Sequence, residues 1–264
     1  MYKLIRKTDL FKVYFRLFLL EASWNYEKMQ NIGVAYALIP IGNRLYPDFD
    51  GRKAFIGRNL KFFNTHPAMA SFIMGVVIHM EEKMKLGEPV TPEEIEALKN
   101  SMMGPLAAMG DNFFWEYLRP FCAVIGVCII LLCGDKYGLA FLGPLVALFL
   151  YNAFGLSVRY AGIIKGYENG PSIINYIAKL DLRSMNERLS LIALVMIGSL
   201  FPFLFSLNNA GLLPFQIQAM HHSLQGLFMF LSLLLLLLFL KIKITPTVLF
   251  YGIIIGIIML TYIY

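Results

Sequence analysis

The stretch SMMGPLAAMGDNFFWEYLRP, which runs from Ser101 to Pro120, decides how this chain is built. It is apolar enough to enter a membrane, yet it carries the polar and charged residues Asp111, Asn112, Glu116 and Arg119. Its glycines and its Gly-Pro pair predict a broken helix over 101–120 rather than one uninterrupted spanning helix. Ionisable groups at membrane depth are costly unless they line a cavity or pack inside protein. We therefore expect this stretch to line a path within a membrane.

A simpler role is open for Asp111. Aspartate is a favoured N-cap residue, and Gly110 before it could make the turn into a short helix over 112–118. In transport proteins, by contrast, broken helices offer freed backbone groups to a substrate. The sequence alone leaves the capping role and the substrate role of Asp111 both open.

The composition indicates a polytopic membrane protein. Hydrophobic residues make up 58% of the 264 residues and charged residues only 15%, with a mean hydropathy of +0.64. A soluble domain of this length normally has a larger fraction of charged residues, about 25%. The net charge of +6 suits contact with an anionic leaflet, whereas nucleic-acid binding would need dense basic clusters that do not occur. The fold class expected is all-α and membrane-embedded, without a nucleic-acid partner.

A membrane domain is expected over residues 101–264. After the broken helix 101–120 come five apolar segments, each somewhat shorter than the roughly 20 residues of an ordinary span. They cover 119–133, 138–154, 191–207, 224–240 and 247–264. The C-terminal two-thirds of the chain is therefore predicted to hold about five spanning helices.

Residues 1–100 are expected to form interfacial or cytoplasmic amphipathic helices and short re-entrant segments. Residues 4–20 mix aromatic and basic side chains, which fits a helix on the cytoplasmic leaflet or against a partner protein. The apolar pieces 32–42 and 68–80 are too short to span, and Asn64 or Thr65 could cap the second. Thr91-Pro92-Glu93-Glu94 predicts a helix start with a capping box.

Lysine and arginine residues predict the topology. They occur in the predicted loop 155–190 and in the turn 241–246, but not in the predicted loop 208–223. Cytoplasmic loops carry an excess of these residues. The first two regions are therefore expected inside and 208–223 outside, which places the N-terminus in the cytoplasm and the C-terminus outside.

Several ordered blocks resemble one family over nearly the whole chain. Its signature is matched by Gly104-Pro105-Leu106-Ala107, Gly110-Asp111, Phe114-Trp115 and Arg119-Pro120. Further blocks are Trp24 to Gln30, Arg44 to Pro47, Phe62 to Pro67, Gly143-Pro144-Leu145, Asn152, Tyr160 to Gly162 and Gly166-Tyr167. The chain resembles the IID membrane subunit of mannose/fructose/sorbose-family sugar phosphotransferase systems.

The resemblance implies a transport subunit rather than an enzyme. Such a subunit works with a IIC membrane subunit to translocate a hexose or amino sugar across the bacterial cell membrane. Soluble IIA and IIB components pass phosphate between histidines and on to the sugar, and IID itself is not the phosphorylated subunit. The resemblance therefore implies oligomers of IIC–IID pairs in the lipid bilayer, with no catalytic residue, cofactor or metal in this chain.

Sugar sites pair aromatic stacking with polar hydrogen bonding. This chemistry singles out residues of the opening stretch and of one family block as candidates to line or gate a substrate path: Asp111, Asn112, Trp115, Arg119, Asn64 and His66. Two alternatives stay open. One is a structural subunit that docks IIC and a soluble phosphocarrier. The other is an intramembrane enzyme using Asp111 with Glu116 or His66 as acid and base, although residues five apart do not share a face of an α-helix.

Overall fold

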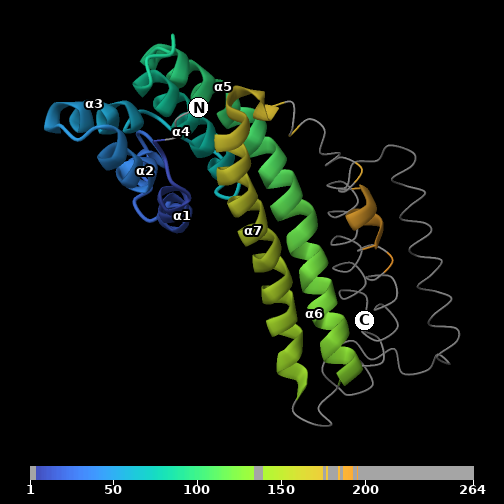
Figure 1. Cartoon of the computed structure of the whole chain (residues 1–264). Helices are drawn as coiled ribbons and strands as arrows, with labels where there is room; N and C mark the ends of the chain where they lie inside the picture. Colours follow the sequence, from blue (N-terminus) through green and yellow to red (C-terminus); the bar gives the residue numbers. More distant parts are fainter. Residues whose placement is uncertain are drawn as a thin grey trace, which may run out of the picture. The chain divides into compact units, whose positions relative to one another are not determined.

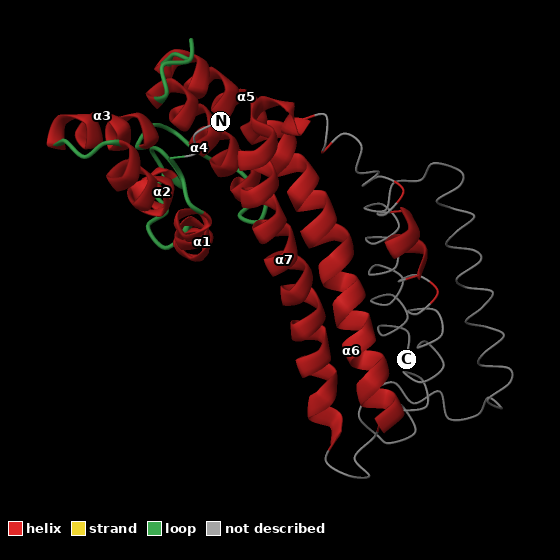
Figure 2. Ribbon diagram, in the orientation of Figure 1, coloured by secondary structure: helices red, strands yellow, loops and turns green. Residues whose placement is uncertain are grey.

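The computed structural model describes residues 4–133 and 139–174, together with 177, 184, 187–192 and 195. Within this part the regular structure is helical, as expected for an all-α protein, and Figure 2 shows helices joined by short loops. The elements are α1 (Lys7–Arg16), η1 (Leu17–Leu19), α2 (Asn31–Leu45), α3 (Phe49–Asn59), α4 (Ala70–Lys85), α5 (Pro92–Gly110), η2 (Asp111–Leu118), α6 (Arg119–Cys133), η4 (Leu139–Phe141), α7 (Leu142–Asn169) and η5 (Gly170–Ser172).

The predicted break in 101–120 is wrong. The helix α5 continues through η2 into α6 as one helical stretch, and Pro105 lies inside α5. Gly110 and Asp111 both have right-handed helical backbone angles, so Asp111 does not cap a new helix. The stretch η2 is a π-helix, a wider turn with i→i+5 hydrogen bonds that leaves the helix continuous. Its backbone groups are therefore not freed in the way that a broken helix would free them.

Gly110 serves close packing rather than a turn. A Cβ at this position would collide with the Cβ and Cγ atoms of His66. The missing side chain thus lets the segment before α4 approach the long helix closely. This is why a glycine next to Asp111 does not mark the helix break that its sequence context suggests.

Two helical stretches, Pro92–Leu131 and Leu139–Ser172, are long and apolar enough to cross a membrane. The predicted spans 119–133 and 138–154 lie in these stretches, with only positions 132, 133 and 138 beyond their ends. Helix α7 has 28 residues and continues to Asn169, so the first part of the predicted loop 155–190 is helical. The predicted spans 224–240 and 247–264 lie outside the described residues, as does 191–207 apart from 191, 192 and 195.

Helix α7 packs on both α4 and α6. Helices α6 and α7 run side by side in opposite directions (Figure 1). Against α4 the approach is close at Gly75, where a Cβ would lie 2.7 Å from the carbonyl oxygen of Ile163 and from the amide nitrogen of Tyr167. Residues of α2, α3 and α4 pack with Ile163 in a shared apolar core, in which Leu38, Phe55 and Ile73 are fully buried.

The N-terminal helices follow the sequence patterns in part. A helix does form within 4–20, and the apolar piece 32–42 lies within α2, which continues past Pro40 to Leu45. Thr91 and Glu94 make the predicted capping box at the start of α5. The predicted cap of α4 is wrong, because no side chain caps that helix and the Thr65 hydroxyl instead donates to the Met103 carbonyl at 3.1 Å.

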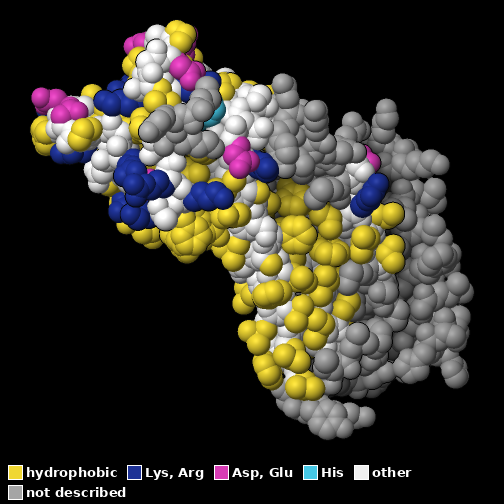
Figure 3. Space-filling view, viewed as in Figure 1, with side chains coloured by type: hydrophobic (Ala, Val, Ile, Leu, Met, Phe, Trp, Pro, Cys, Tyr) yellow, Lys and Arg dark blue, Asp and Glu magenta, His cyan; other side chains and the backbone are white. Residues whose placement is uncertain are grey.

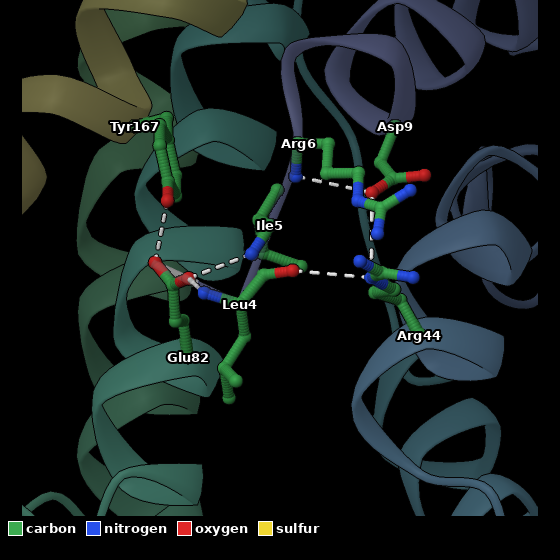
Figure 4. Close-up of polar contacts among 7 residues, drawn as sticks. All are labelled: Leu4, Ile5, Arg6, Asp9, Arg44, Glu82 and Tyr167. Atoms are coloured by element: carbon green, nitrogen blue, oxygen red, sulfur yellow. Dashed lines mark hydrogen bonds and ion pairs between the residues drawn. The ribbon is translucent and has the colours of Figure 1, made fainter. Parts of the chain in front are cut away.

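A buried carboxylate ties the N-terminal segment to α4 and α7 (Figure 4). Glu82 accepts hydrogen bonds from the backbone N–H groups of Leu4 and Ile5, at 2.6 and 2.8 Å, and from the Tyr167 hydroxyl at 2.5 Å. Arg44 of α2 donates to the Leu4 carbonyl at 3.1 Å. Three separate elements thus meet at the segment that precedes α1.

Candidate substrate-path site

The π-helix η2 has one buried face and one polar face. Phe113, Phe114 and Leu118 are buried against neighbouring side chains. The opposite face is exposed and is formed by Asp111, Asn112, Trp115, Glu116 and Arg119. We call this set the η2 polar face. Four of the six predicted site residues therefore stand together on one side of a stretch that is apolar enough to cross a membrane.

His66 joins this helix from the segment before α4. Its ring stacks on that of Phe114, with centroids 4.7 Å apart and planes at 13°, and meets Trp115 edge-on at 6.1 Å. The His66 side chain is buried, and its Nδ1 accepts a hydrogen bond from the Ala68 backbone N–H at 3.2 Å. His66 and Trp115, both candidates from the sequence, thus lie against each other.

His66 is neutral at physiological pH. Burial lowers its pKa from the usual 6.5 to about 4, with a further contribution from the cation of Arg159, while the carboxylate of Asp111 acts in the opposite direction. In a neutral imidazole that accepts through Nδ1, the proton is on Nε2. His66 therefore provides one N–H donor through Nε2 rather than a positive charge.

A pocket of about 230 Å³ lies where η1, the segment 66–68, η2 and α7 meet. Its polar and aromatic lining includes Glu21, His66, Trp115, Tyr151, Asn152 and Arg159. The Asn152 amide nitrogen donates to the Leu148 carbonyl, and the Arg159 guanidinium lies 4.9 Å from the Phe18 ring centroid. We call this cavity the α7 pocket.

The remaining predicted residues fall outside the α7 pocket. Arg119 places its guanidinium 5.2 Å from the ring centroid of Trp115. Asp111 is near enough to His66 to influence its pKa, and no ion pair of Asp111 is found in the described part of the chain. Asn64 is exposed, with its backbone N–H 3.3 Å from the Met103 sulfur, so its role in a substrate path stays a prediction.

Sequence reasoning missed the α7 side of the pocket. Asn152 and Arg159 are seven residues apart, which places them on one face of a continuous helix. The prediction of a loop from residue 155 onward hid this relationship. In the sequence Asn152 stands out only as part of a family block, and no pattern singles out Glu21.

The geometric objection to an acid–base pair of Asp111 and Glu116 does not hold in this structure. It assumed an α-helix, whereas residues five apart are linked by the hydrogen-bond pattern of a π-helix. Both residues lie on the η2 polar face.

Over the described ranges, no group of three or more His, Cys, Asp or Glu side chains could hold a metal ion.

Two helical stretches long and apolar enough to cross a membrane, with a polar and partly aromatic pocket beside them, fit the class of helical membrane proteins. The family model for the PTS system mannose/fructose/sorbose family IID component matches residues 4–264. The chain therefore belongs to the IID component family of these sugar phosphotransferase systems, which confirms the resemblance drawn from its sequence blocks.

Named relatives agree with this assignment. The chain is 35% identical over 199 residues to the mannose-specific EIID component of Escherichia coli K12, covering 75% of this chain and 68% of the relative. It is 34% identical to the fructose permease IID component of Bacillus subtilis, covering 75% and 70%. It also resembles a chain in the structure of the mannose transporter ManYZ with microcin E492, with 30% identity, a TM-score of 0.58 and coverage of 96% and 95%.

Proposed function

We propose that this chain acts with a IIC subunit to translocate a hexose or amino sugar, which soluble IIA and IIB components phosphorylate. One observation carries the proposal, namely the exposed η2 polar face inside the stretch Pro92–Leu131. A charged side chain facing hydrocarbon costs at least about 2.5 kcal/mol. At membrane depth the η2 polar face would be stable against protein or a water-filled path but not against lipid, and the proposal gives it such a neighbour.

A IIC partner is the best-supported neighbour for this face. One solved structure with a similar chain is that of the mannose transporter ManYZ in complex with microcin E492, and such a complex fits a chain that works with a partner subunit. Helix α7, by contrast, exposes an apolar surface that includes Leu145, Leu148 and Phe149. In Figure 3 hydrophobic side chains cover the visible face of the long helices, while Lys and Arg gather over the N-terminal helices. Lipid thus suits the apolar surface, and a partner subunit suits the η2 polar face.

The proposed setting is the bacterial cell membrane, with the N-terminus in the cytoplasm and the C-terminus outside. It rests on the distribution of Lys and Arg, part of which now falls in α7 at Arg159 and Lys165. Alkaline phosphatase fused after Tyr264 should be active, because this enzyme requires export. The same fusion near Lys179 should be inactive, and the reverse pattern would overturn the layout.

A docking subunit is the second candidate, and one groove favours it. A cavity of about 350 Å³ lies between α2 and α3, with Ile39, Phe49 and Ile56 as apolar walls and Arg52 and Lys53 as cations. A basic groove of this kind could receive an acidic surface of a soluble phosphocarrier. In this case the chain would recruit partners without contacting sugar.

Deletion of this chain with the IIC subunit retained separates the two candidates. Radiolabelled sugar entry is measured in cells and in vesicles that lack the soluble components. If this chain helps to form the path, entry is lost in both. Entry into vesicles that persists without this chain would favour the docking role.

In membranes that hold both subunits, we expect the two to co-purify as an oligomer of pairs, because the η2 polar face is covered by the partner.

A further inference from the structure

We infer that the α7 pocket binds the ring of a neutral sugar, so that this subunit contacts the substrate directly. The inference rests on the proposed function, since it gives the transported substrate a site on this chain. The pocket is concave, combines apolar walls with a few polar groups, and adjoins the η2 polar face through Trp115. Small-molecule sites generally have this composition.

The charges in the α7 pocket favour a neutral ligand. Arg159 brings one positive charge and Glu21 one negative charge, while His66 is neutral at physiological pH. A phosphate or carboxylate ligand would be attracted by Arg159 but repelled by Glu21. A sugar hydroxyl both donates and accepts hydrogen bonds, so it can use the cation and the carboxylate together. The pocket should consequently hold an unmodified sugar in preference to its phosphorylated product.

The donors and acceptors of the pocket also match a ring that carries several hydroxyl groups. His66 offers the N–H of Nε2, because its Nδ1 is occupied by the Ala68 N–H. Asn152 uses its amide nitrogen on the Leu148 carbonyl, which leaves its side-chain oxygen as an acceptor. Glu21 accepts from Gln30 at 3.3 Å through one oxygen and has further acceptor positions.

Aromatic side chains supply the remaining part of a sugar site. Trp115 is 47% exposed, so part of its indole surface is free to contact a ligand, while Arg119 lies near the same ring. The stack of His66 on Phe114 holds the imidazole ring, and with it the N–H donor, in place at the pocket. Fixed aromatic and hydrogen-bonding groups reduce the entropy that is lost when a ligand binds.

Photoaffinity labelling tests this inference directly. The complex of this chain with its IIC partner is purified in nanodiscs and irradiated with a diazirine derivative of mannose, and the labelled peptides are mapped by mass spectrometry. We expect adducts in the peptides that contain His66, Trp115 and Asn152. Unlabelled mannose or fructose should compete with the probe and reduce this labelling. Competition by inorganic phosphate or by phosphatidylglycerol instead of sugar would overturn the inference.

Substitutions in the pocket and one control outside it sharpen the test. Trp115→Ala and Asn152→Leu should each lower labelling by about tenfold, the factor that corresponds to a loss of about 1.4 kcal/mol of binding. Leu145→Ala, on the exposed surface of α7 and outside the pocket, should not change it. Co-purification with the IIC subunit shows that each variant is assembled. Because His66→Gln keeps a neutral N–H donor, it should retain more labelling than His66→Phe.

The outcomes distinguish the inference from the proposed function. Adducts that map only to the IIC chain, while sugar entry still requires this chain, would overturn a sugar site here and leave the transport role intact. Sugar entry that persists in vesicles without this chain would overturn the transport role itself. Equal labelling of His66→Phe and His66→Gln would contradict the role of the imidazole donor.

Discussion

The ring of His66 lies parallel to the ring of Phe114, with centroids 4.7 Å apart, and this stack attaches the segment before α4 to the π-helix η2. The contact is possible because Gly110, one turn earlier in the long helix, has no side chain where His66 lies. Burial in this contact also lowers the pKa of His66 to about 4. One histidine thereby connects the packing of the site with its electrostatics.

The first prediction concerns pH and stability. The folded-state pKa of His66 is below its usual 6.5, so the unfolded chain binds more protons between pH 6.5 and about 4. Stability from neutral His66 is therefore fully present above pH 6.5 and is lost as the pH falls toward 4. Lowering the pH from 7.5 to 4.5 should reduce the free energy of unfolding by about 2–3 kcal/mol through this residue. Over roughly two pH units of this range the unfolded chain is protonated at His66 and the folded chain is not.

Thermal unfolding of the detergent-solubilised complex at these two pH values measures this effect. His66→Gln removes the titrating group and should flatten the pH dependence. His79, whose pKa is also lowered by burial, contributes in the same direction and stays in both proteins. An identical pH dependence in the wild type and in His66→Gln would contradict the burial of an uncharged His66.

The second prediction uses a pair of glycines. Gly75→Ala should destabilise the protein by about 1–3 kcal/mol, because the new Cβ would meet the backbone of α7 at Ile163 and Tyr167 and the two helices would have to separate. Gly104→Ala, in α5, has no atom within 4 Å of the added Cβ. It should stabilise by about 0.5–1 kcal/mol through helix propensity. Equal unfolding midpoints for the two variants would argue against the close packing of α4 on α7.

The third prediction concerns the N-terminal segment. Glu82→Gln removes the charge that accepts from Leu4, Ile5 and Tyr167, and hydrogen bonds to charged groups are worth about 1.5–3 kcal/mol. We expect faster proteolysis before α1 and a lower unfolding temperature. Tyr167→Phe should show a smaller loss, and Tyr26→Phe, at a residue that is 89% exposed, should show none. Unchanged proteolysis in Glu82→Gln would mean that this contact does not hold the segment.

Local signals were sufficient for part of the fold. The capping box at Thr91 and the amphipathic pattern before residue 20 depend on neighbours in sequence, and both gave helices. The break predicted from the glycines and the Gly-Pro pair of 101–120 was wrong, because packing against residues far away in the chain accompanies a continuous long helix. His66, 44 positions before Gly110, occupies the space that the glycine leaves open.

The candidate site was predicted on one side only. Residue chemistry and the sequence blocks selected the η2 polar face and His66, since these residues stand out in apolar surroundings. The α7 side depended on a helix that continues through Arg159, whereas cations at that point favoured a cytoplasmic loop. No local pattern could show that Glu21 lines the same pocket, because that follows from the tertiary position of η1.

The most direct test of the account is sugar uptake by Asp111→Asn at matched abundance of the assembled complex. Asparagine keeps the size of the side chain and removes its charge from the η2 polar face, next to His66. We predict normal co-purification with the IIC subunit and uptake at least roughly tenfold slower, which corresponds to about 1.4 kcal/mol on the barrier. Glu93→Gln, an exposed carboxylate at the start of the same long helix, should transport normally. Normal uptake by Asp111→Asn would contradict a substrate path along the η2 polar face.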